Sequence, residues 1–564
     1  MKKLFLLIGF LFCSTSVLFA QYTDYNTVKE VSVKNKGVVV SAFPLASEVG
    51  AKILHQGGNA FDASIATQYA LAVVYPQAGN IGGGGFMVAR TDKNKKFVVD
   101  FRETAPSKSD IDMYLDADGH ADTELSQYGR LAAGVPGAVA GLFEMHQYAN
   151  LPMAQLIQPA IDLAEKGYAL TQDQADLFNR YKDNFVSLNE NSIPFVKSTP
   201  WKADDILIQK DLAQTLKIIQ KKGRKGFYEG HTAELIVKEM KRGNGIISLA
   251  DLKNYKVIER EPLIFDYKGN EVVTMPLPSS GGILLAQMLR MTAMDGLEDK
   301  QLNSPEAVQL IVEAERRAFA DRAEYMGDPD FIKDQTQMLI SKAYLKKRFA
   351  NYNPHKATPS SDVGDIITPQ SEAKETTHIS VLDKEGNAVS VTTTLNGNFG
   401  SMVMVSDAGF LLNNEMDDFS VKPGVPNMFG ALGGKANAIA PQKRMLSSMV
   451  PTVILKDNKP FMVVGTPGGT TIPTSVFQTI VDIIDFDTDV NTAVNAPKFH
   501  HQWLPEHVMV EADFPNYTIK ALEKKGYTFK KVSKIGRTEL ILVDKDGSYH
   551  AVADGRGDDS VSVE

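Results

Sequence analysis

The chain has 564 residues, a formal net charge of −8 at pH 7 and a single cysteine, Cys13. Its basic residues form no block, which argues against a nucleic-acid partner. One cysteine rules out an internal disulfide and a cysteine-based zinc site. The length is sufficient for a large buried core, and the glycine, proline and apolar content is that of an ordinary globular protein.

Residues 1–20 have the pattern of a secretory signal peptide, with Lys2 and Lys3 before an apolar stretch at residues 4–12. The alternative is a single membrane anchor, but this stretch is shorter than the roughly 20 residues that a membrane span requires. We therefore expect cleavage before Gln21, no stable membrane span, and a periplasmic or secreted protein. Loss of the two lysines changes the formal charge from −8 to −10.

In chain order, the first features are a short apolar run at residues 38–42 and an alanine-rich helix expected within residues 47–75. Asn59 or a neighbour is placed to cap this helix. The glycine-rich stretch at residues 79–87 invites comparison with a phosphate-binding loop. No Lys-Ser or Lys-Thr pair follows it and its spacing fits no dinucleotide fingerprint, so close backbone packing at a strand start is favoured.

Residues 97–101 predict a strand that delivers Arg102 at its end. An arginine just beyond a strand is most often part of a surface ion pair, and the alternative is a bidentate clamp for a substrate carboxylate. Residues 130–350 are expected to be mainly helical with scattered strands. Within them, a charged helix at residues 307–325 is interpreted as a solvated or ion-paired face. The PLPSSGG loop at residues 276–282 either lines a cleft or joins two elements.

A β-hairpin is predicted near the start of the last third of the chain. A polar, proline-bearing loop at residues 351–374 precedes β-branched and apolar residues at 377–382. A KEGN turn at residues 384–387 then leads into a second strand-like run at residues 388–395.

The register of this hairpin places two threonines side by side. If Leu382 pairs with Ala388, the numbers of opposing residues sum to 770, and Thr376 lies opposite Thr394. Cleavage of the backbone before Thr376 would give this threonine a free α-amine, which can act as base for its own hydroxyl. The alternative is an ordinary threonine-rich strand.

Three acids within four residues follow the hairpin, at Glu415, Asp417 and Asp418. A solvated turn is one interpretation, and an EF-hand calcium loop is disfavoured because the acids do not alternate toward a spaced glutamate. The loop at residues 423–434 contains glycine hinges that suit a lid.

A glycine pair stands between a predicted strand and a predicted helix. The strand at residues 461–465 leads through Gly468 and Gly469 into a helix at residues 472–484. Such a junction leaves backbone N–H groups free at a helix N-terminus, where they can stabilise an oxyanion. The alternative is an ordinary glycine turn.

These segments together resemble the γ-glutamyltransferases, the γ-glutamyltranspeptidase/glutathione hydrolase family of the N-terminal nucleophile hydrolases. The resemblance extends from about residue 38 to residues 551–558 and is strongest at residues 376–505. The motifs that carry it, in the family's order, are GGNAFDA, GNIGGGGFM, DFRETAP, PLPSSGG, TTHISVLDKEGNAVSVTTTLN, LLNNEMDDFS, PGVPN, RMLSSMVPT, GTPGG and NAPKFHHQWLP. One such motif is weak evidence, whereas ten in order are highly specific.

The resemblance implies an α+β fold, a four-layer αββα sandwich built from both products of an internal cleavage. The precursor would cut itself between Glu375 and Thr376. A large subunit of residues 21–375 and a small subunit of residues 376–564 would then share one globular core as a heterodimer. Thr376 would be the nucleophile and Thr394 the hydroxyl that supports it, in agreement with the hairpin register.

A γ-glutamyl head group is a zwitterion at its α-carbon, so it requires a cation and hydroxyls on one side and acids on the other. The roles carried over by matching motifs form three groups: a carboxylate clamp of Arg102, Ser447 and Ser448, ammonium partners Asn396, Glu415 and Asp418, and oxyanion donors Gly468 and Gly469.

The sequence departs from the family's pattern in three places. Phe429 stands in the lid where many bacterial members have tyrosine, so a hydrogen bond from that tyrosine is lost and looser lid closure is expected. Glu415 stands where some members have glutamine and remains a suitable partner for an ammonium group. The tail at residues 553–558 differs from the Asp-Pro-Arg type sequence of many members and is given no role.

The resemblance implies an autoprocessing γ-glutamyltransferase with glutathione hydrolase activity, with no metal and no organic cofactor. Thr376 would take the γ-glutamyl group from glutathione or a related compound and pass it to water or to an amino acid or peptide acceptor. One rival is a related acylase that cleaves cephalosporin-like or other side-chain amides, and retention of Arg102, Ser447, Ser448 and Asp418 argues against it. A second rival is a non-catalytic binding protein, and the intact threonine and glycine pairs argue against that.

Overall fold

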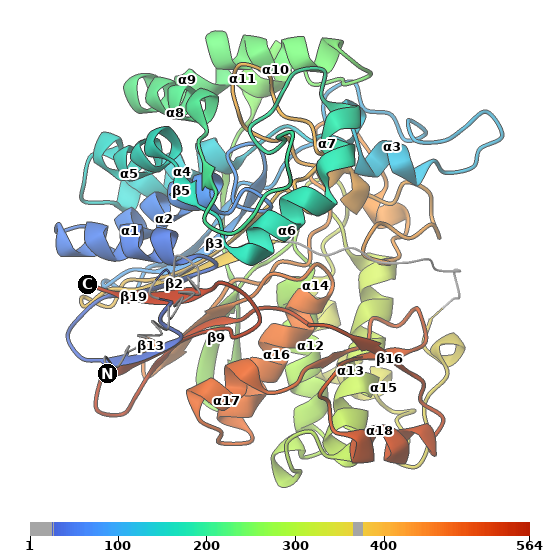
Figure 1. The fold of residues 1–564 in the computed structure, drawn as a ribbon. Coiled ribbons are helices and arrows are strands. Elements are labelled where there is room, and N and C mark those ends of the chain that lie inside the picture. The colour runs from blue at the N-terminus through green and yellow to red at the C-terminus, as the bar shows by residue number, and fades with distance from the viewer. Residues whose placement is uncertain (1–24, 26, 365–375) are drawn as a thin grey trace, which may run out of the picture.

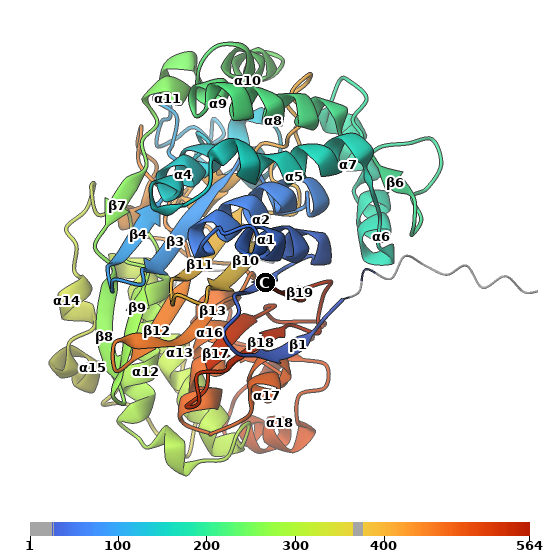
Figure 2. The ribbon, with the colours of Figure 1, turned by 90° about the vertical axis from the view of Figure 1, so that its left-hand side faces the viewer.

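The computed structural model describes Tyr25, residues 27–364 and residues 376–564. The predicted signal peptide and Glu375 lie outside these residues. Two seven-stranded sheets lie face to face, and helices cover the outer face of each (Figures 1 and 2). This arrangement confirms the predicted four-layer αββα sandwich. In the part of the chain that is described, no helix combines the length and apolar character needed to span a membrane.

The first sheet is antiparallel and interleaves strands from distant parts of the chain. In spatial order its strands are β19 (Ser560–Val563), β2 (Val38–Ser41), β10 (Thr377–Leu382), β11 (Ala388–Thr394), β3 (Gly84–Arg90), β4 (Lys96–Asp100) and β7 (Ile258–Arg260). The hairpin of β10 and β11 therefore lies between β2 and β3, which come from the first hundred residues.

The second sheet is also antiparallel and combines both parts of the chain. In spatial order its strands are β1 (Glu30–Val33), β18 (Tyr549–Ala553), β17 (Glu539–Val543), β13 (Lys459–Gly465), β12 (Thr452–Lys456), β9 (Asn270–Thr274) and β8 (Leu263–Tyr267). Two smaller sheets lie outside the sandwich and contain β14 (Phe499–His500), β15 (Val508–Glu511) and β16 (Phe529–Val532), and β5 (Tyr168–Ala169) and β6 (Ile206–Leu207).

Helices from the N-terminal region cover the first sheet, and helices from the later part of the chain cover the second (Figure 2). The former are α1 (Pro44–His55), α2 (Ala60–Val74) and α4 (Ala138–Met145), while α5 (Met153–Lys166) packs on α2 and α8 (Lys210–Lys222) packs on α5. The latter are α12 (Gly281–Ala293), α16 (Thr471–Ile484) and α17 (Val490–Asn495), while α13 (Pro305–Tyr325) packs on α12. The remaining helices are α3 (Thr123–Gln127), α6 (Gln172–Arg180), α7 (Lys182–Leu188), α9 (Lys225–Tyr228), α10 (His231–Lys241), α11 (Leu249–Asn254), α14 (Thr336–Leu339), α15 (Lys342–Arg348) and α18 (Asn516–Glu523).

Two local predictions in the N-terminal region are confirmed. Asn59 caps α2, because its side chain accepts hydrogen bonds from the amides of Phe61 and Asp62 while the carboxylate of Asp62 accepts one from the Asn59 amide. The glycine-rich stretch packs at the start of β3. A Cβ atom on Gly85 would lie 2.2 Å from the carbonyl oxygen of Thr392 in the neighbouring strand.

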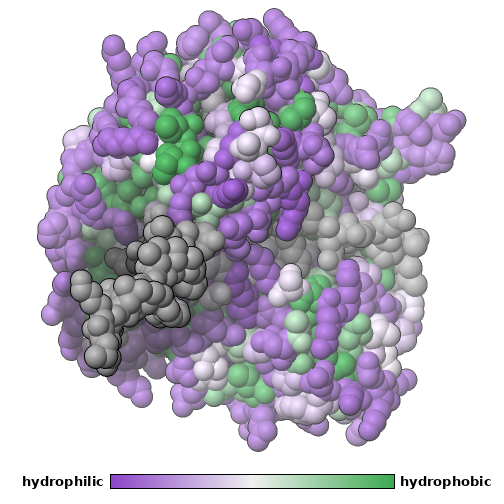
Figure 3. Space-filling model, viewed as in Figure 1, coloured by the Kyte–Doolittle hydropathy of each residue, from purple (hydrophilic) through white to green (hydrophobic). Residues whose placement is uncertain are grey.

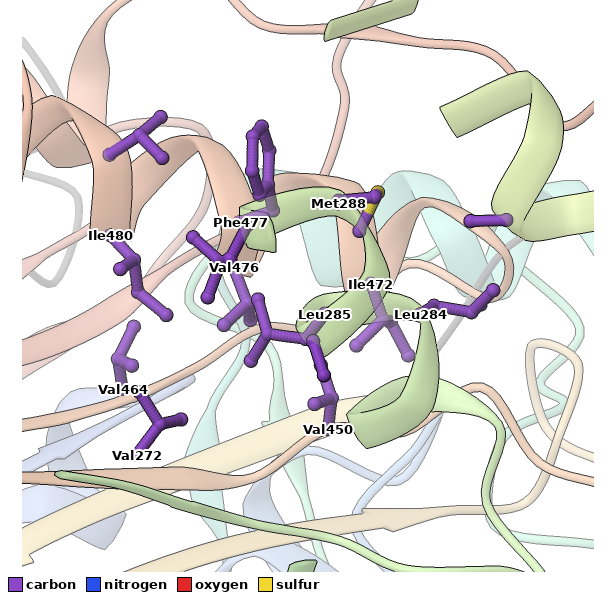
Figure 4. Packing of buried hydrophobic residues seen from close by; sticks show 14 of the residues in the cluster. Val272, Leu284, Leu285, Met288, Val450, Val464, Ile472, Val476, Phe477 and Ile480 are labelled. Carbon is purple, nitrogen blue, oxygen red and sulfur yellow. The ribbon is translucent and has the colours of Figure 1, made fainter. Parts of the chain in front are cut away.

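Figure 4 shows the hydrophobic core where the second sheet meets α12 and α16. Val272 of β9 and Val464 of β13 lie near Leu285 of α12 and Val476 and Ile480 of α16. Burial of each such side chain contributes about 1.5–3 kcal/mol relative to exposure, so this packing holds α16 against the sheet. On the face of the molecule shown in Figure 3, hydrophilic side chains predominate and hydrophobic ones form small separate groups.

A polar layer lies between the two sheets. His378 of β10 is fully buried, and its Nδ1 and Nε2 lie 2.8 and 3.1 Å from the hydroxyls of Thr392 and Ser380. Ser380 in turn donates a hydrogen bond to the carbonyl oxygen of Glu539 in the facing sheet, at 3.1 Å. Burial lowers the pKa of His378 to about 3, so the ring is neutral at physiological pH. A Cβ atom on Gly465 would lie only 2.1–2.5 Å from three atoms of this ring.

The charged helix α13 is not a solvated face, and that part of its sequence interpretation is wrong. Residues 307–323 are buried, because α13 packs against both α12 and α18 and carries apolar residues on every side. The alternative of ion pairing is correct for several of its charges. Arg317 Nη1 lies 2.6 Å from Glu313 Oε2, and Asp321 Oδ1 lies 2.9 Å from Arg348 Nε.

The contact between Gly465 and His378 gives a test of the packing of the two sheets. Gly465→Ala is expected to lower the free energy of unfolding by about 1–3 kcal/mol, because its methyl group would overlap the imidazole. Adding His378→Ser should recover part of this loss, so the two substitutions should be non-additive in urea unfolding. Full stability of the Gly465→Ala protein, or strict additivity, would contradict this contact.

Candidate active site

A small cavity opens where the end of β4, the hairpin and the N-terminus of α16 meet. Eight of the ten residues predicted to form the site line it. The two others are adjacent, since Glu415 lies behind Arg102 and Gly468 precedes the lining residue Gly469. The lining residues are Arg102, Arg322, Thr376, Thr394, Asn396, Asp418, Asn427, Phe429, Ser447, Ser448, Met449, Gly469, Thr470 and Ile472.

The predicted hairpin register is confirmed, and it brings the two threonine hydroxyls together. Leu382 pairs with Ala388 and Thr377 with Thr393, so Thr376 lies opposite Thr394 just before β10 begins. The Thr376 hydroxyl donates to Thr394 Oγ1 at 3.4 Å. Thr376 is 3 % exposed, which places a hydroxyl in a largely dry position.

The residues after β11 fix the orientation of the second threonine. The backbone amide of Asn396 donates to Thr394 Oγ1 at 2.8 Å. Asn396 has a φ of +79°, a conformation that asparagine tolerates better than most residues. Its side-chain amide donates to the carbonyl oxygen of Asn414 at 3.0 Å, which ties the hairpin to the acidic turn.

Arg102 is buried, and its interpretation as a surface ion pair is wrong. It is 1 % exposed, and its Nε donates to the carbonyl oxygen of Met445 at 3.3 Å. Nη1 lies 2.6 Å from Glu415 Oε2, and Nη2 binds the carboxylate of Asp418. Local sequence could not reveal this environment, because both acids lie more than 300 residues away in the chain.

Glu415 and Asp417 of the acidic turn are also fully buried, so its interpretation as a solvated turn is wrong as well. Glu103 is a third acid near Arg102, at 3.7 Å from Nη1, and its carboxylate accepts no hydrogen bond from a described residue. Burial raises the pKa of both Glu103 and Glu415. Because Glu103 has the longest contact with Arg102, we assign the proton of this crowded cluster to Glu103.

The PLPSSGG loop packs directly behind the serine pair, and none of its residues lines the cavity. Both the amide and the hydroxyl of Ser280 donate to the carbonyl oxygen of Ser447, at 2.9 and 2.7 Å. The amide of Ser447 donates to the carbonyl oxygen of Pro278 at 2.9 Å. The hydroxyl of Ser447 accepts from the amide of Met449 at 3.0 Å, and Ser448 lines the cavity beside it.

The glycine pair leaves two amides free at the N-terminus of α16. Gly468 and Gly469 have φ angles of +139° and +57°, which strongly favour glycine. Neither amide donates a hydrogen bond to a described residue. A Cβ atom on Gly469 would also lie 2.5 Å from Cδ1 of Phe429. Free N–H groups at a helix N-terminus are suited to an oxyanion.

The loop at residues 423–434 covers the cavity from the side of the acids. Asn427 Nδ2 donates to Asp418 Oδ1 at 2.9 Å, and the amide of Met428 donates to Asp417 Oδ2 at 2.8 Å. Burial raises the pKa of Asp417 to about 7. Phe429 is 7 % exposed and lines the cavity, a position consistent with the predicted lid. Opening and closing of this loop stay a prediction.

Sequence reasoning missed several lining residues, of which Arg322 is the most polar. It lies in the last turn of α13, and the interpretation of that helix as solvated concealed it. The apolar residues on every side of α13 were the signal that could have indicated burial. In the described residues, Asp116, Asp118 and His120 have ligand atoms within 4.8 Å of one another and could hold a metal, but all three are exposed and none lines the cavity.

Comparisons with known proteins agree over nearly the whole chain. The family model described as gamma-glutamyltranspeptidase matches residues 46–564. The glutathione hydrolase proenzyme of Escherichia coli (strain K12) is 44% identical over 531 residues, which cover 94% of this chain and 92% of that protein. The protein of the same name from Pseudomonas aeruginosa is 45% identical, with 92% and 93% covered. The acylase ACY 1 proenzyme of Pseudomonas sp. (strain V22) is 35% identical, with 95% of each covered.

Solved structures show the same fold. The cephalosporin acylase from Bacillus halodurans has a TM-score of 0.83 at 26% identity, and the match covers 98% of this chain and 99% of that chain. The gamma-glutamyltranspeptidase of Helicobacter pylori has a TM-score of 0.56 at 44% identity, and the match covers 57% of this chain and 93% of that chain.

The hydroxyl of Thr394 can be removed without changing the shape of its side chain. Thr394→Val is expected to slow turnover of a γ-glutamyl anilide about tenfold to a hundredfold, because the Thr376 hydroxyl and the Asn396 amide both lose their acceptor. Thr393→Val is the matched control, since that hydroxyl donates to the carbonyl oxygen of Gly84 instead. Equal effects of the two variants on turnover per folded molecule would contradict a role for Thr394.

Proposed function

Because the chain belongs to the gamma-glutamyltranspeptidase family, we propose that it is an autoprocessing γ-glutamyltransferase with glutathione hydrolase activity. One observation carries this proposal. The Thr376 hydroxyl lies in a cavity between free amides at a helix N-terminus and a cluster of opposite charges. The hydroxyl and the free amides suit acyl transfer to Thr376, and the cluster of opposite charges suits a zwitterionic head group.

Maturation uses the Thr376 hydroxyl within the precursor. Its oxygen attacks the carbonyl carbon of Glu375, the peptide C–N bond breaks, and the nitrogen takes the proton. Water then hydrolyses the resulting ester, which releases the Glu375 carboxylate and regenerates the hydroxyl beside a new α-amine. The proenzyme names of the relatives support this step for the present chain.

The products would be a large subunit of residues 21–375 and a small subunit of residues 376–564, held together as a heterodimer. The position of β10 and β11 between β2 and β3 supports a shared core, because neither piece can complete the first sheet alone. The pattern of residues 1–20 supports export to the periplasm or the medium.

Catalysis then uses the same hydroxyl. The new α-amine accepts the proton of Thr376 Oγ1, which attacks the γ-carbonyl carbon of glutathione or a related compound. The oxyanion faces the amides of Gly468 and Gly469. The leaving amine takes the proton as the C–N bond breaks, and a γ-glutamyl ester remains. Water gives glutamate from this ester, and an amino acid or peptide amine gives a new γ-glutamyl compound.

The charged cluster would hold the head group by an exchange of partners. In the structure Glu415 and Asp418 pair with Arg102. The α-ammonium of the substrate would bind these acids and Asn396. The α-carboxylate of the substrate would bind the guanidinium and the hydroxyls of the serine pair. Each ion then keeps a partner, which limits the cost of burying charge.

The acylase alternative remains an outcome of the test, because a relative and a solved structure carry acylase names. Glutathione hydrolysis faster than hydrolysis of a glutaryl-cephalosporin amide supports the γ-glutamyl function. The opposite order supports the acylase. The paired acids and guanidinium favour the first result, since a glutaryl group has no ammonium to bind.

The first test concerns maturation. The wild-type protein should give two bands on a denaturing gel, of 355 residues (21–375) and 189 residues (376–564). The small one should begin Thr-Thr-His-Ile. Thr376→Ala should leave one uncut and inactive chain, because both steps need this hydroxyl. A small subunit with any other N-terminus would refute Thr376 as the nucleophile.

The second test concerns the carboxylate clamp. Charge-assisted hydrogen bonds contribute about 1.5–3 kcal/mol each, so Arg102→Ala should cost roughly tenfold to several hundredfold in kcat/KM, and Arg102→Lys should recover only part of it. Processing should survive, because the precursor bond has no γ-glutamyl head. The wild-type protein should strongly prefer γ-glutamyl anilide over the decarboxylated 4-aminobutyryl anilide. Retention of the full preference in the Arg102→Ala protein would place the clamp elsewhere.

A further inference from the structure

Arg322 is a second guanidinium in the cavity, and its surroundings differ from those of Arg102. Arg322 is 5 % exposed and lines the cavity from the end of α13. Its Nε donates to Ser280 Oγ at 3.1 Å. Among the described residues, no other group accepts a hydrogen bond from this side chain, and it forms no ion pair. Four of its five N–H donors therefore remain for a ligand.

Arg102, in contrast, already has both terminal nitrogens occupied. Glu415 and Asp418 bind them in the structure. An incoming carboxylate must displace one of these acids to reach Arg102. The same carboxylate can reach the terminal nitrogens of Arg322 without displacing a described partner.

Arg322 also lies at the end of the cavity where the serine pair is held. Ser280, which accepts from Arg322, donates twice to the carbonyl oxygen of Ser447. Arg322 is thus connected to the segment of the serine pair through one side chain. The charges of Asp418 and Arg102 both act on Arg322, which places it beside the head-group cluster. Burial lowers the pKa of Arg322 to about 10, so it is cationic at neutral pH.

With the proton of the cluster assigned to Glu103, Arg322 becomes the second positive charge at the site. Glu415 and Asp418 supply two negative charges and, with a proton on Glu103, Arg102 supplies one positive charge. Arg322 supplies the second, so a zwitterion adds no net charge to a neutral site. Without Arg322 an uncompensated carboxylate would repel the α-carboxylate of the substrate.

We propose that Arg322 is a specificity-determining residue that shares the α-carboxylate of the γ-glutamyl substrate with Arg102 and the serine pair. The proposal rests on the proposed function, because it assigns a further residue to the same site. Arg322 would select for head groups that carry a carboxylate next to the ammonium. It would not contact the leaving group of the substrate.

The test compares three variants on three substrates. Arg322→Gln should lower kcat/KM for γ-glutamyl anilide and for glutathione alike, by about tenfold to a hundredfold, and should change 4-aminobutyryl anilide little. Arg316→Gln is the matched control, since Arg316 is equally buried on α13 but binds Ser360 and Glu506 away from the cavity. It should leave the substrate preference unchanged. Ser280→Ala keeps the guanidinium charge and the Ser280 amide bond to Ser447 but removes the acceptor of Arg322 Nε, so it should lose less of the preference than Arg322→Gln.

Three results would overturn the proposal. An equal loss on all three substrates would make Arg322 purely structural. A loss confined to glutathione would place it at the carboxylate of the leaving group. A Ser280→Ala protein with the same losses as Arg322→Gln would mean that Arg322 only positions Ser280.

A binding measurement can test the role of Arg322 independently of the proposed catalytic function. Calorimetry of the wild-type protein should show tighter binding of L-glutamate than of 4-aminobutyrate, and Arg322→Gln should remove about tenfold or more of that difference. Absence of turnover in the wild-type protein would refute the proposed function while leaving this measurement intact. An unchanged difference in the Arg322→Gln protein would refute the role of Arg322 alone.

Discussion

A guanidinium removed from bulk water is stable only beside carboxylates, and the site is built around one such group. Arg102, at the end of a strand near the start of the chain, is held by Glu415 and Asp418 from a turn more than 300 residues later. Asp418 also anchors Asn427 of the loop that covers the cavity. One set of ion pairs therefore fixes the strand end, the acidic turn and the covering loop relative to one another.

This arrangement also supports the proposed binding of a charged ligand in a largely dry cavity. Removing isolated charges from water costs free energy, and the charges of this site are already desolvated and paired when the protein folds. A ligand would then exchange partners within a site whose groups are already oriented, so less ordering would be left for the binding step. Two hydrogen bonds from Ser280 also orient Ser447 in advance, and the backbone conformations of Gly468 and Gly469 orient their amides.

What could be predicted from the sequence depended on how local each signal was. The meeting of Thr376 and Thr394 followed from strand alternation and a short turn, and the cap at Asn59 from three adjacent residues. The burial of Arg102 and Arg322 did not follow, because their environments are made by segments far away in the chain. A charged residue in a local pattern looks solvated until its distant partners are known. Family resemblance supplied a role for Arg102, and it supplied none for Arg322.

If the chain is cleaved before Thr376 as proposed, the interleaving of strands means that the two pieces could separate only by unfolding. After cleavage, β10 would still exchange backbone hydrogen bonds with β2 on one side, and β11 with β3 on the other. Pulling the pieces apart would open the middle of a sheet and expose fully buried residues such as Val39 and Ile379. An ordinary heterodimer weakens on dilution because its folded partners can part. Here no folded partner exists to be released, so the nicked protein should behave as one molecule at any concentration.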